Sequence, residues 1–223
     1  MIGKIKKFNF KSLLILNTFA LIATSYFFNN FIFIGVFTLF FFVSLFATKN
    51  GLEIIRKLNL LQNIRPEGPS NHYKKRDTPT MGGILLIIPF LIFLLIITIN
   101  LSSLKLFLLL MTIFGFFITG FLDDYLSVRN KKNTGLKTKE KFILQSIISI
   151  IFIFLAYEKN LISPLITISD SWVINMNIFI LPVSFLVLVG ISNSVNLTDG
   201  LDGLAAGCSG IVFNVLGTEI LMK

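Results

Sequence analysis

The stretch SLLILNTFALIATSYFFNNFIFIGVFTLFFFVSLFAT, residues 12–48, carries no charged side chain and decides the fold class. As one helix its 37 residues would be about 55 Å long, whereas a bilayer core is about 30 Å thick and takes about 20 residues. We therefore expect two short membrane helices that turn near Asn29 and Asn30. The sequence leaves open whether residues 12–28 cross the bilayer or lie along its interface.

The composition of the whole chain is that of a membrane protein. Of its 223 residues, 54% are hydrophobic and only 14% are charged, whereas about a quarter are charged in soluble domains. One cysteine, Cys208, and one histidine, His72, exclude an internal disulfide and a metal site built from Cys and His. The uncharged stretches predict an all-α, multi-pass transmembrane helical bundle of about seven spans, at 12–28, 31–48, 83–99, 104–121, 142–157, 173–191 and 203–221.

The positions of the basic residues predict the orientation of this bundle. Seventeen of the 20 Lys and Arg residues fall on one side of the alternating spans, in residues 1–11, 49–82 and 122–141. Because basic residues gather on the cytoplasmic side, we expect the N-terminus and the loops 49–82, 122–141 and 192–202 to be cytoplasmic. The net charge of +9 then mostly reflects topology, and we expect no nucleic-acid partner.

Three polar segments lie at the expected cytoplasmic helix ends, and helix packing could bring them together in one site. Each segment alone also has a structural explanation: positive-inside anchoring, a solvated helix end, or helix capping with glycine packing. They read KKRDTPTMGG at 74–83, GFLDDY at 120–125 and NLTDGLDGL at 196–204.

Asp123 and Asp124 close a long apolar helix. A carboxylate at the bilayer centre costs roughly 2.5–3.5 kcal/mol, so this pair belongs at the interface or in a wet cleft. Neighbouring helical residues point about 100° apart, which favours different roles for the two groups. One carboxylate could hold a hard cation while the other holds or deprotonates a substrate group.

The other two segments suit a phosphorylated ligand. Three cations precede the Thr-Pro-Thr turn at 78–80, and two glycines after it allow a close backbone approach. Asn196, Asp199 and Asp202 are spaced three apart and share a face at helical spacing. Thr198 or Asp199 could cap the helix that follows.

Lys141 ends the third basic stretch, just before the next expected helix. Its ammonium could reach a phosphate. Attraction to anionic lipids also explains the stretch as a whole.

Taken together, these segments resemble the phospho-N-acetylmuramoyl-pentapeptide transferases, within the superfamily of polyprenyl-phosphate N-acetylhexosamine-1-phosphate transferases. The resemblance covers most of the chain from about residue 31, and TPTMGG and NLTDGLDGLA are its most specific motifs. The matching residues are RPEGP at 65–69, His72, Lys75-Arg76, TPTMGG at 78–83, GFLDDY at 120–125, Lys141-Phe142, Gln145 and NSVNLTDGLDGLA at 193–205.

The resemblance implies a Mg²⁺-dependent transfer at the cytoplasmic face of the bacterial inner membrane, in peptidoglycan synthesis for cell-wall growth, cell shape and division. Undecaprenyl phosphate attacks the sugar-linked phosphate of UDP-N-acetylmuramoyl-pentapeptide, so that UMP leaves and lipid I forms. The resemblance to the family is also compatible with a homodimer. By resemblance, Asp123 and Asp124 are catalytic and near the metal. The substrate-binding residues would be Lys75, Thr80, Lys141, Asn196, Asp199 and Asp202.

The sequence also departs from the family pattern. Asp77 stands where a glycine is usual, and neither the third aspartate in a Phe-x-Gly-Asp context nor a histidine-rich loop occurs. We therefore expect the N-terminal part of the family fold. Two alternatives to a transferase stay open: a non-catalytic membrane remnant or partner subunit, and a transporter or channel. The acidic residues gather at one face with none at mid-span, which disfavours the transporter.

Overall fold

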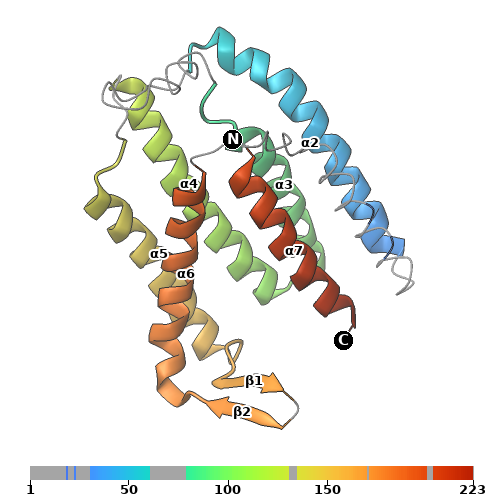
Figure 1. The fold of residues 1–223 in the computed structure, drawn as a ribbon, viewed down its shortest axis with the longest axis vertical. Coiled ribbons are helices and arrows are strands. Elements are labelled where there is room, and N and C mark those ends of the chain that lie inside the picture. The colour runs from blue at the N-terminus through green and yellow to red at the C-terminus, as the bar shows by residue number, and fades with distance from the viewer. Residues whose placement is uncertain are drawn as a thin grey trace, which may run out of the picture. The chain divides into compact units, whose positions relative to one another are not determined.

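The computed structural model describes residues 19, 23, 31–60, 79–130, 135–169, 171–199 and 203–222. Helices dominate this part of the chain, which confirms the all-α, multi-pass class (Figure 1). The helices are α2 (Phe31–Lys57), α3 (Gly83–Leu101), α4 (Leu104–Arg129), α5 (Thr138–Glu158), α6 (Ile180–Thr198) and α7 (Leu204–Met222).

Five of the described helical segments are long and apolar enough to cross a membrane. They are Thr38–Lys57, Gly83–Leu101, Leu104–Arg129, Thr138–Glu158 and Asn177–Thr198. In α7 the apolar stretch is shorter, Leu204–Gly217. The expected span 12–28 lies outside the described residues except at positions 19 and 23, which are helical. The chain is therefore a multi-pass membrane helical protein.

Two helices run past the ends that the uncharged stretches predict. Helix α2 continues from residue 48 to Lys57, and α4 continues from residue 121 to Arg129. Charged side chains mark where the chain leaves the hydrocarbon core, but they do not interrupt the backbone hydrogen bonds that continue a helix. Parts of the expected loops 49–82 and 122–141 are consequently helical.

The expected helix over 173–191 is wrong at its start, where the structure has a β-hairpin. Strand β1 (Leu165–Ser169) pairs antiparallel with β2 (Trp172–Asn175), and a short 3-10 helix (Asn177–Phe179) then leads into α6. β-branched residues occupy the middle of β1, at 166–168, and two positions of β2, at 173 and 174, and these side chains favour a pleated surface. An uncharged apolar run does not by itself distinguish a strand from the beginning of a helix.

The described residues fall into two compact units, of which the larger comprises residues 42–190. In this larger unit α4 contacts both α3 and α5. The two-residue connection Ser102-Ser103 turns the chain back between α3 and α4, and the Ser103 hydroxyl accepts the backbone N–H of Leu106 at 3.5 Å. Gly115 lets α5 approach α4, since a Cβ there would lie 3.0 Å from the Ile148 side chain.

Candidate active site

Both oxygens of the Asp123 carboxylate are held by groups of the chain itself. The Lys141 Nζ, in the first turn of α5, lies 2.9 Å from Oδ2 and donates to it. The backbone N–H of Leu136 donates to Oδ1 at 2.9 Å. Asp123 on α4 is thus clamped from two directions by the connection into α5 and by the start of that helix.

The way α5 begins explains how Lys141 comes to this place. The Glu140 carboxylate accepts the backbone N–H of Lys137 at 2.9 Å and so fixes the entry into the helix. Helix α5 starts at Thr138, so Lys141 is inside its first turn rather than before the helix as expected. The positive end of the helix dipole and the Lys141 ammonium therefore lie together beside Asp123.

Gly135 makes the close approach of this connection possible. A Cβ at residue 135 would overlap the backbone carbonyl oxygen of Asp123 and would lie 2.6 Å from its Oδ1. The connection therefore packs directly on the backbone of α4, with no room for a side chain. Neither contact can be predicted from the residue types, because one depends on the missing side chain of Gly135 and the other on the backbone N–H of Leu136.

The ion pair is largely removed from solvent. The side chain of Lys141 is 17% exposed and that of Asp123 is 25% exposed. A charge-assisted bond of 2.9 Å at this depth is stronger than a surface ion pair, and removing one partner would leave the other charge poorly solvated. The pair consequently joins α4 to α5 as well as placing a carboxylate.

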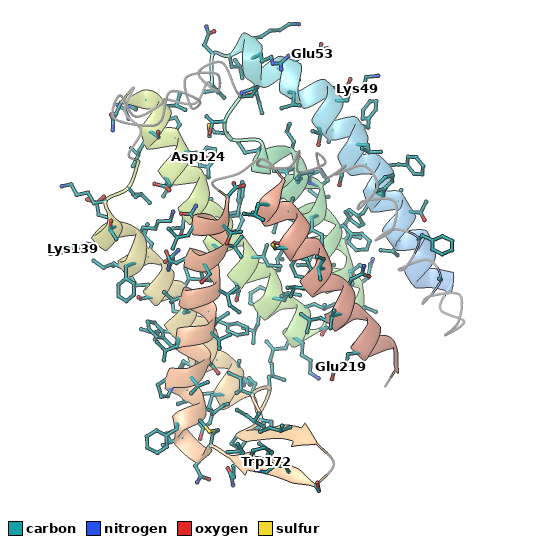
Figure 2. The ribbon with its side chains drawn as sticks, in the orientation of Figure 1. Lys49, Glu53, Asp124, Lys139, Trp172 and Glu219 are labelled. Atoms are coloured by element: carbon teal, nitrogen blue, oxygen red, sulfur yellow. The ribbon has the colours of Figure 1, made fainter. Side chains whose placement is uncertain are left out.

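Asp124 follows Asp123 on α4, so the two side chains point about 100° apart. It is half-buried and lies at the same end of the larger unit as Lys139 of α5 (Figure 2). The expectation that the pair closes its helix is wrong, because α4 continues to Arg129. Helical turns precede and follow the two residues in α4, so the backbone fixes the directions in which their side chains leave the helix.

A line of polar residues continues from the ion pair into the interior. One turn inward on α4, the buried Thr119 hydroxyl donates to the Gly115 carbonyl at 3.1 Å. On α5, Gln145 and Ser149 follow Lys141 at four-residue steps and are almost fully buried. Helical residues four apart lie on one face, so these side chains form a polar seam on the buried side of α5. The sequence signal for this seam is a polar residue at every fourth position of an otherwise apolar helix.

Thr80 lies three residues before the N-terminal end of α3, in the larger unit. Its backbone N–H donates to the carbonyl of Leu60 at 2.9 Å, so Thr80 lies beside the residue that follows α2 by three positions. Met81 follows with a positive φ of 64° and is buried. Lys75, the other predicted residue of this motif, lies outside the described residues.

Asn196 and Asp199 belong to the smaller unit and are both exposed. The helical hydrogen-bond pattern reaches Asp199, because its backbone N–H donates to the Val195 carbonyl at 3.2 Å, four residues earlier. The expectation that Thr198 or Asp199 caps the next helix is wrong. The Thr198 hydroxyl donates to the Ser194 carbonyl at 2.8 Å, and α6 ends at this residue. Helix α7 begins only at Leu204, so Gly203 and not Thr198 or Asp199 directly precedes it. Asp202 lies outside the described residues.

The donors at this site suit a hard cation such as Mg²⁺. Within the part of the chain that the structure describes, no group of three or more His, Cys, Asp or Glu residues is placed to hold a metal. Mg²⁺ is nevertheless commonly held by one or two carboxylates together with substrate phosphates and water. Asp123 and Asp124 are the carboxylates of this site that could serve in this way.

These features define a membrane-embedded helical protein with a positioned pair of carboxylates beside a basic helix start. Residues 106–222 match the family described as glycosyl transferase family 4, and residues 75–87 match the phospho-N-acetylmuramoyl-pentapeptide-transferase signature 1. The family match covers more than half of the chain and includes Asp123, Asp124 and Lys141. The chain belongs to glycosyl transferase family 4.

Individual proteins that are similar to this chain share one more specific name. A phospho-N-acetylmuramoyl-pentapeptide-transferase of Prochlorococcus marinus (strain MIT 9215) is 87% identical over 223 residues, which are 100% of this chain and 62% of the relative. The protein of the same name from Halalkalibacterium halodurans is 42% identical over 165 residues, 73% of this chain and 50% of the relative. These matches confirm the resemblance found in the sequence. The chain spans 62% of the length of the relative from strain MIT 9215.

Proposed function

We propose that this chain forms the membrane-embedded N-terminal part of a phospho-N-acetylmuramoyl-pentapeptide transferase. The enzyme would move phospho-N-acetylmuramoyl-pentapeptide from its UDP-linked precursor to undecaprenyl phosphate, releasing UMP and forming lipid I. The observation that carries this proposal is the clamped Asp123 beside Asp124, within a family that transfers glycosyl groups. The signature over residues 75–87 supports the particular substrate.

The chain's own residues suit the handling of phosphates at a membrane surface. The Lys141 ammonium donates to Asp123, and its positive charge beside that carboxylate suits the binding of a phosphate oxygen. Asp123 keeps the charge of Lys141 partly balanced, and Asp124 beside it can hold the metal or accept the proton of the lipid phosphate. Bound Mg²⁺ would neutralise the charge that builds on the pyrophosphate.

The polar residues of the other motifs complete this proposal. Lys75 and Thr80 would line the phosphate region, and Asn196, Asp199 and Asp202 would hold the uridine end. We place the reacting face at the cytoplasmic side of the bacterial inner membrane, because 17 of the 20 basic residues fall on one side of the expected spans. The homodimer stays a prediction.

UMP release tests the proposal. The 223-residue chain would be assayed in bilayers with UDP-N-acetylmuramoyl-pentapeptide, undecaprenyl phosphate and Mg²⁺, alone and fused to the remaining residues of the relative from strain MIT 9215. The variants are Asp123→Asn and Asp124→Asn. Glu158→Gln is the matched control, since it neutralises a carboxyl at the opposite end of α5.

We expect Mg²⁺-dependent UMP release from the fused chain, lost by about 10²-fold or more in both aspartate variants and retained in Glu158→Gln. Release by the unfused chain would assign the activity to residues 1–223 themselves. Absence of release from a folded fusion would contradict the proposal. It would favour the alternative, a non-catalytic membrane remnant or partner subunit.

A further inference from the structure

The β-hairpin connects two membrane spans at the end of the larger unit opposite to the carboxylate pair. It follows α5, which ends at Glu158, and it precedes the span that begins at Asn177. Figure 2 shows Trp172 on this hairpin, at the other end of the larger unit from Asp124 and Lys139. Because Trp172 is only five residues before Asn177, it lies within about 17 Å of the start of that span.

The face of the hairpin that carries Ile166 and Ile174 is apolar and exposed. Ile166 pairs with Ile174 across the strands, and Trp172 shares their face because it is two residues before Ile174. All three side chains are exposed, Trp172 to 61%. Thr167 and Val173 pair on the opposite face. We call the side chains of Ile166, Trp172 and Ile174 the tryptophan face.

The tryptophan face needs to be shielded from water for the hairpin to be stable. A two-stranded hairpin alone is only marginally stable in water, and every residue of β2 is exposed in this structure. Residues 160–179 contain one charged side chain, Asp170. Tryptophan is enriched where membrane proteins pass from hydrocarbon to water, because its ring is apolar and its N–H finds a polar partner there.

We propose that the tryptophan face lies in the surface of the bilayer, with Trp172 at the boundary between headgroups and acyl chains. The hairpin would then anchor the ends of α5 and α6 at the membrane surface opposite to the site of Asp123 and Asp124. The occupant of the face is lipid of any headgroup, since the hairpin carries almost no charge to select one. This inference rests on the spans and the hairpin, and it does not depend on the proposed transfer reaction.

The structure favours lipid over a second protein as this occupant. The bilayer surface is already present at the level where α5 ends and the next span begins, so no further partner has to be recruited. The tryptophan face consists of three side chains, whereas a stable protein interface takes about 20–30 residues on each side. An apolar element lying in the interface plane is buried about 5–10 Å deep, which a single hairpin can reach.

Trp172 is the only tryptophan of the chain and reports its own surroundings. The whole chain would be placed in vesicles of dioleoyl-phosphatidylcholine that contain phosphatidylcholine brominated near the headgroup, or phosphatidylcholine brominated near the end of the acyl chains. Bromine quenches tryptophan fluorescence only on contact. Iodide in the aqueous phase measures exposure to water.

We expect emission at a shorter wavelength than that of tryptophan amide in water, and stronger quenching by shallow bromine than by deep bromine. Quenching by iodide should be weak. The variant Ile166→Thr with Ile174→Thr should shift the emission to longer wavelength and lose most of the bromine quenching. Threonine keeps the β-branched shape, so the hairpin is retained. Val173→Thr, the matched control on the opposite face, should behave as the unsubstituted chain.

Two results would overturn the proposal. Water-like emission with strong iodide quenching in the unsubstituted chain would show that the face lies in solvent. Short-wavelength emission without quenching by either bromolipid would show that protein covers the face, with a second copy as the first candidate. Neither measurement uses UMP release, so failure of the lipid contact and failure of the proposed reaction are observed separately.

Discussion

Substituting Gly135 by alanine should disrupt the clamp on Asp123 without replacing any charged residue. The new methyl would overlap the Asp123 carbonyl and lie 2.6 Å from Oδ1. The obstacle is helix backbone, which cannot rotate away as the end of a side chain can. The connection at residues 135 and 136 must therefore move outward.

The size of the effect follows from the contacts that this movement breaks. The bond from the Leu136 N–H to Asp123 is 2.9 Å long and ends on a charged group, and such bonds contribute about 1.5–3 kcal/mol. Forcing extra volume into a packed site typically costs about 1–3 kcal/mol. Because outward movement relieves part of the overlap, we expect a total loss of about 2–4 kcal/mol in the free energy of unfolding.

The assay is reversible unfolding in mixed micelles of a mild detergent and sodium dodecyl sulfate, followed by the loss of helical circular dichroism. Gly120→Ala on α4 is the matched control, because a Cβ at residue 120 meets nothing within 4 Å. Alanine favours a helix over glycine by about 0.5–1 kcal/mol, so this control should be unchanged or stabilised.

The two glycines thus receive the same substitution with opposite expected results. If Gly135→Ala unfolds at the same detergent fraction as the unsubstituted chain, the close packing of the connection on α4 is not what holds Asp123. A stabilisation like that of Gly120→Ala would refute the steric argument directly. In the fused chain, Gly135→Ala should also slow UMP release, since the Asp123 carboxylate loses its fixed position.

Two further predictions use the same unfolding measurement. Lys141→Met and Asp123→Asn should each lower the free energy of unfolding. The double variant should lose less than the sum of the two, with a coupling of about 1–3 kcal/mol, because the two residues form one ion pair of 2.9 Å. Losses that add to within about 0.5 kcal/mol would contradict that pairing. Ser149→Ala should be neutral or stabilising by about 1 kcal/mol, because its buried hydroxyl has no hydrogen-bond partner among the described residues. The same substitution at Ser103 should cost about 1 kcal/mol through loss of the cap on α4, and equal effects at both serines would contradict this reasoning.

The membrane class and the approximate positions of the helices follow from the sequence alone. Hydrocarbon about 30 Å thick demands uncharged runs of about 20 residues, and that requirement is visible in a one-dimensional pattern. The paired carboxylates of the candidate site are visible for the same reason. Asp123 and Asp124 are costly inside hydrocarbon, so they mark a place at the membrane interface or in a wet cleft. Local periodicity and solvation energies do not depend on which helices become neighbours.

Tertiary structure decided which of these groups meet and where the regular elements end. Lys141 is 18 residues from Asp123, and only the start of α5 at Thr138 turns its ammonium toward α4. The role of Gly135 depends on an approach between two backbones that leaves no mark in residue chemistry. The hairpin at 165–175 depends on strand pairing between segments whose apolar composition also suits a helix. Contacts between distant residues need the rotation and spacing of packed helices, which the order of residues specifies only through the folded structure.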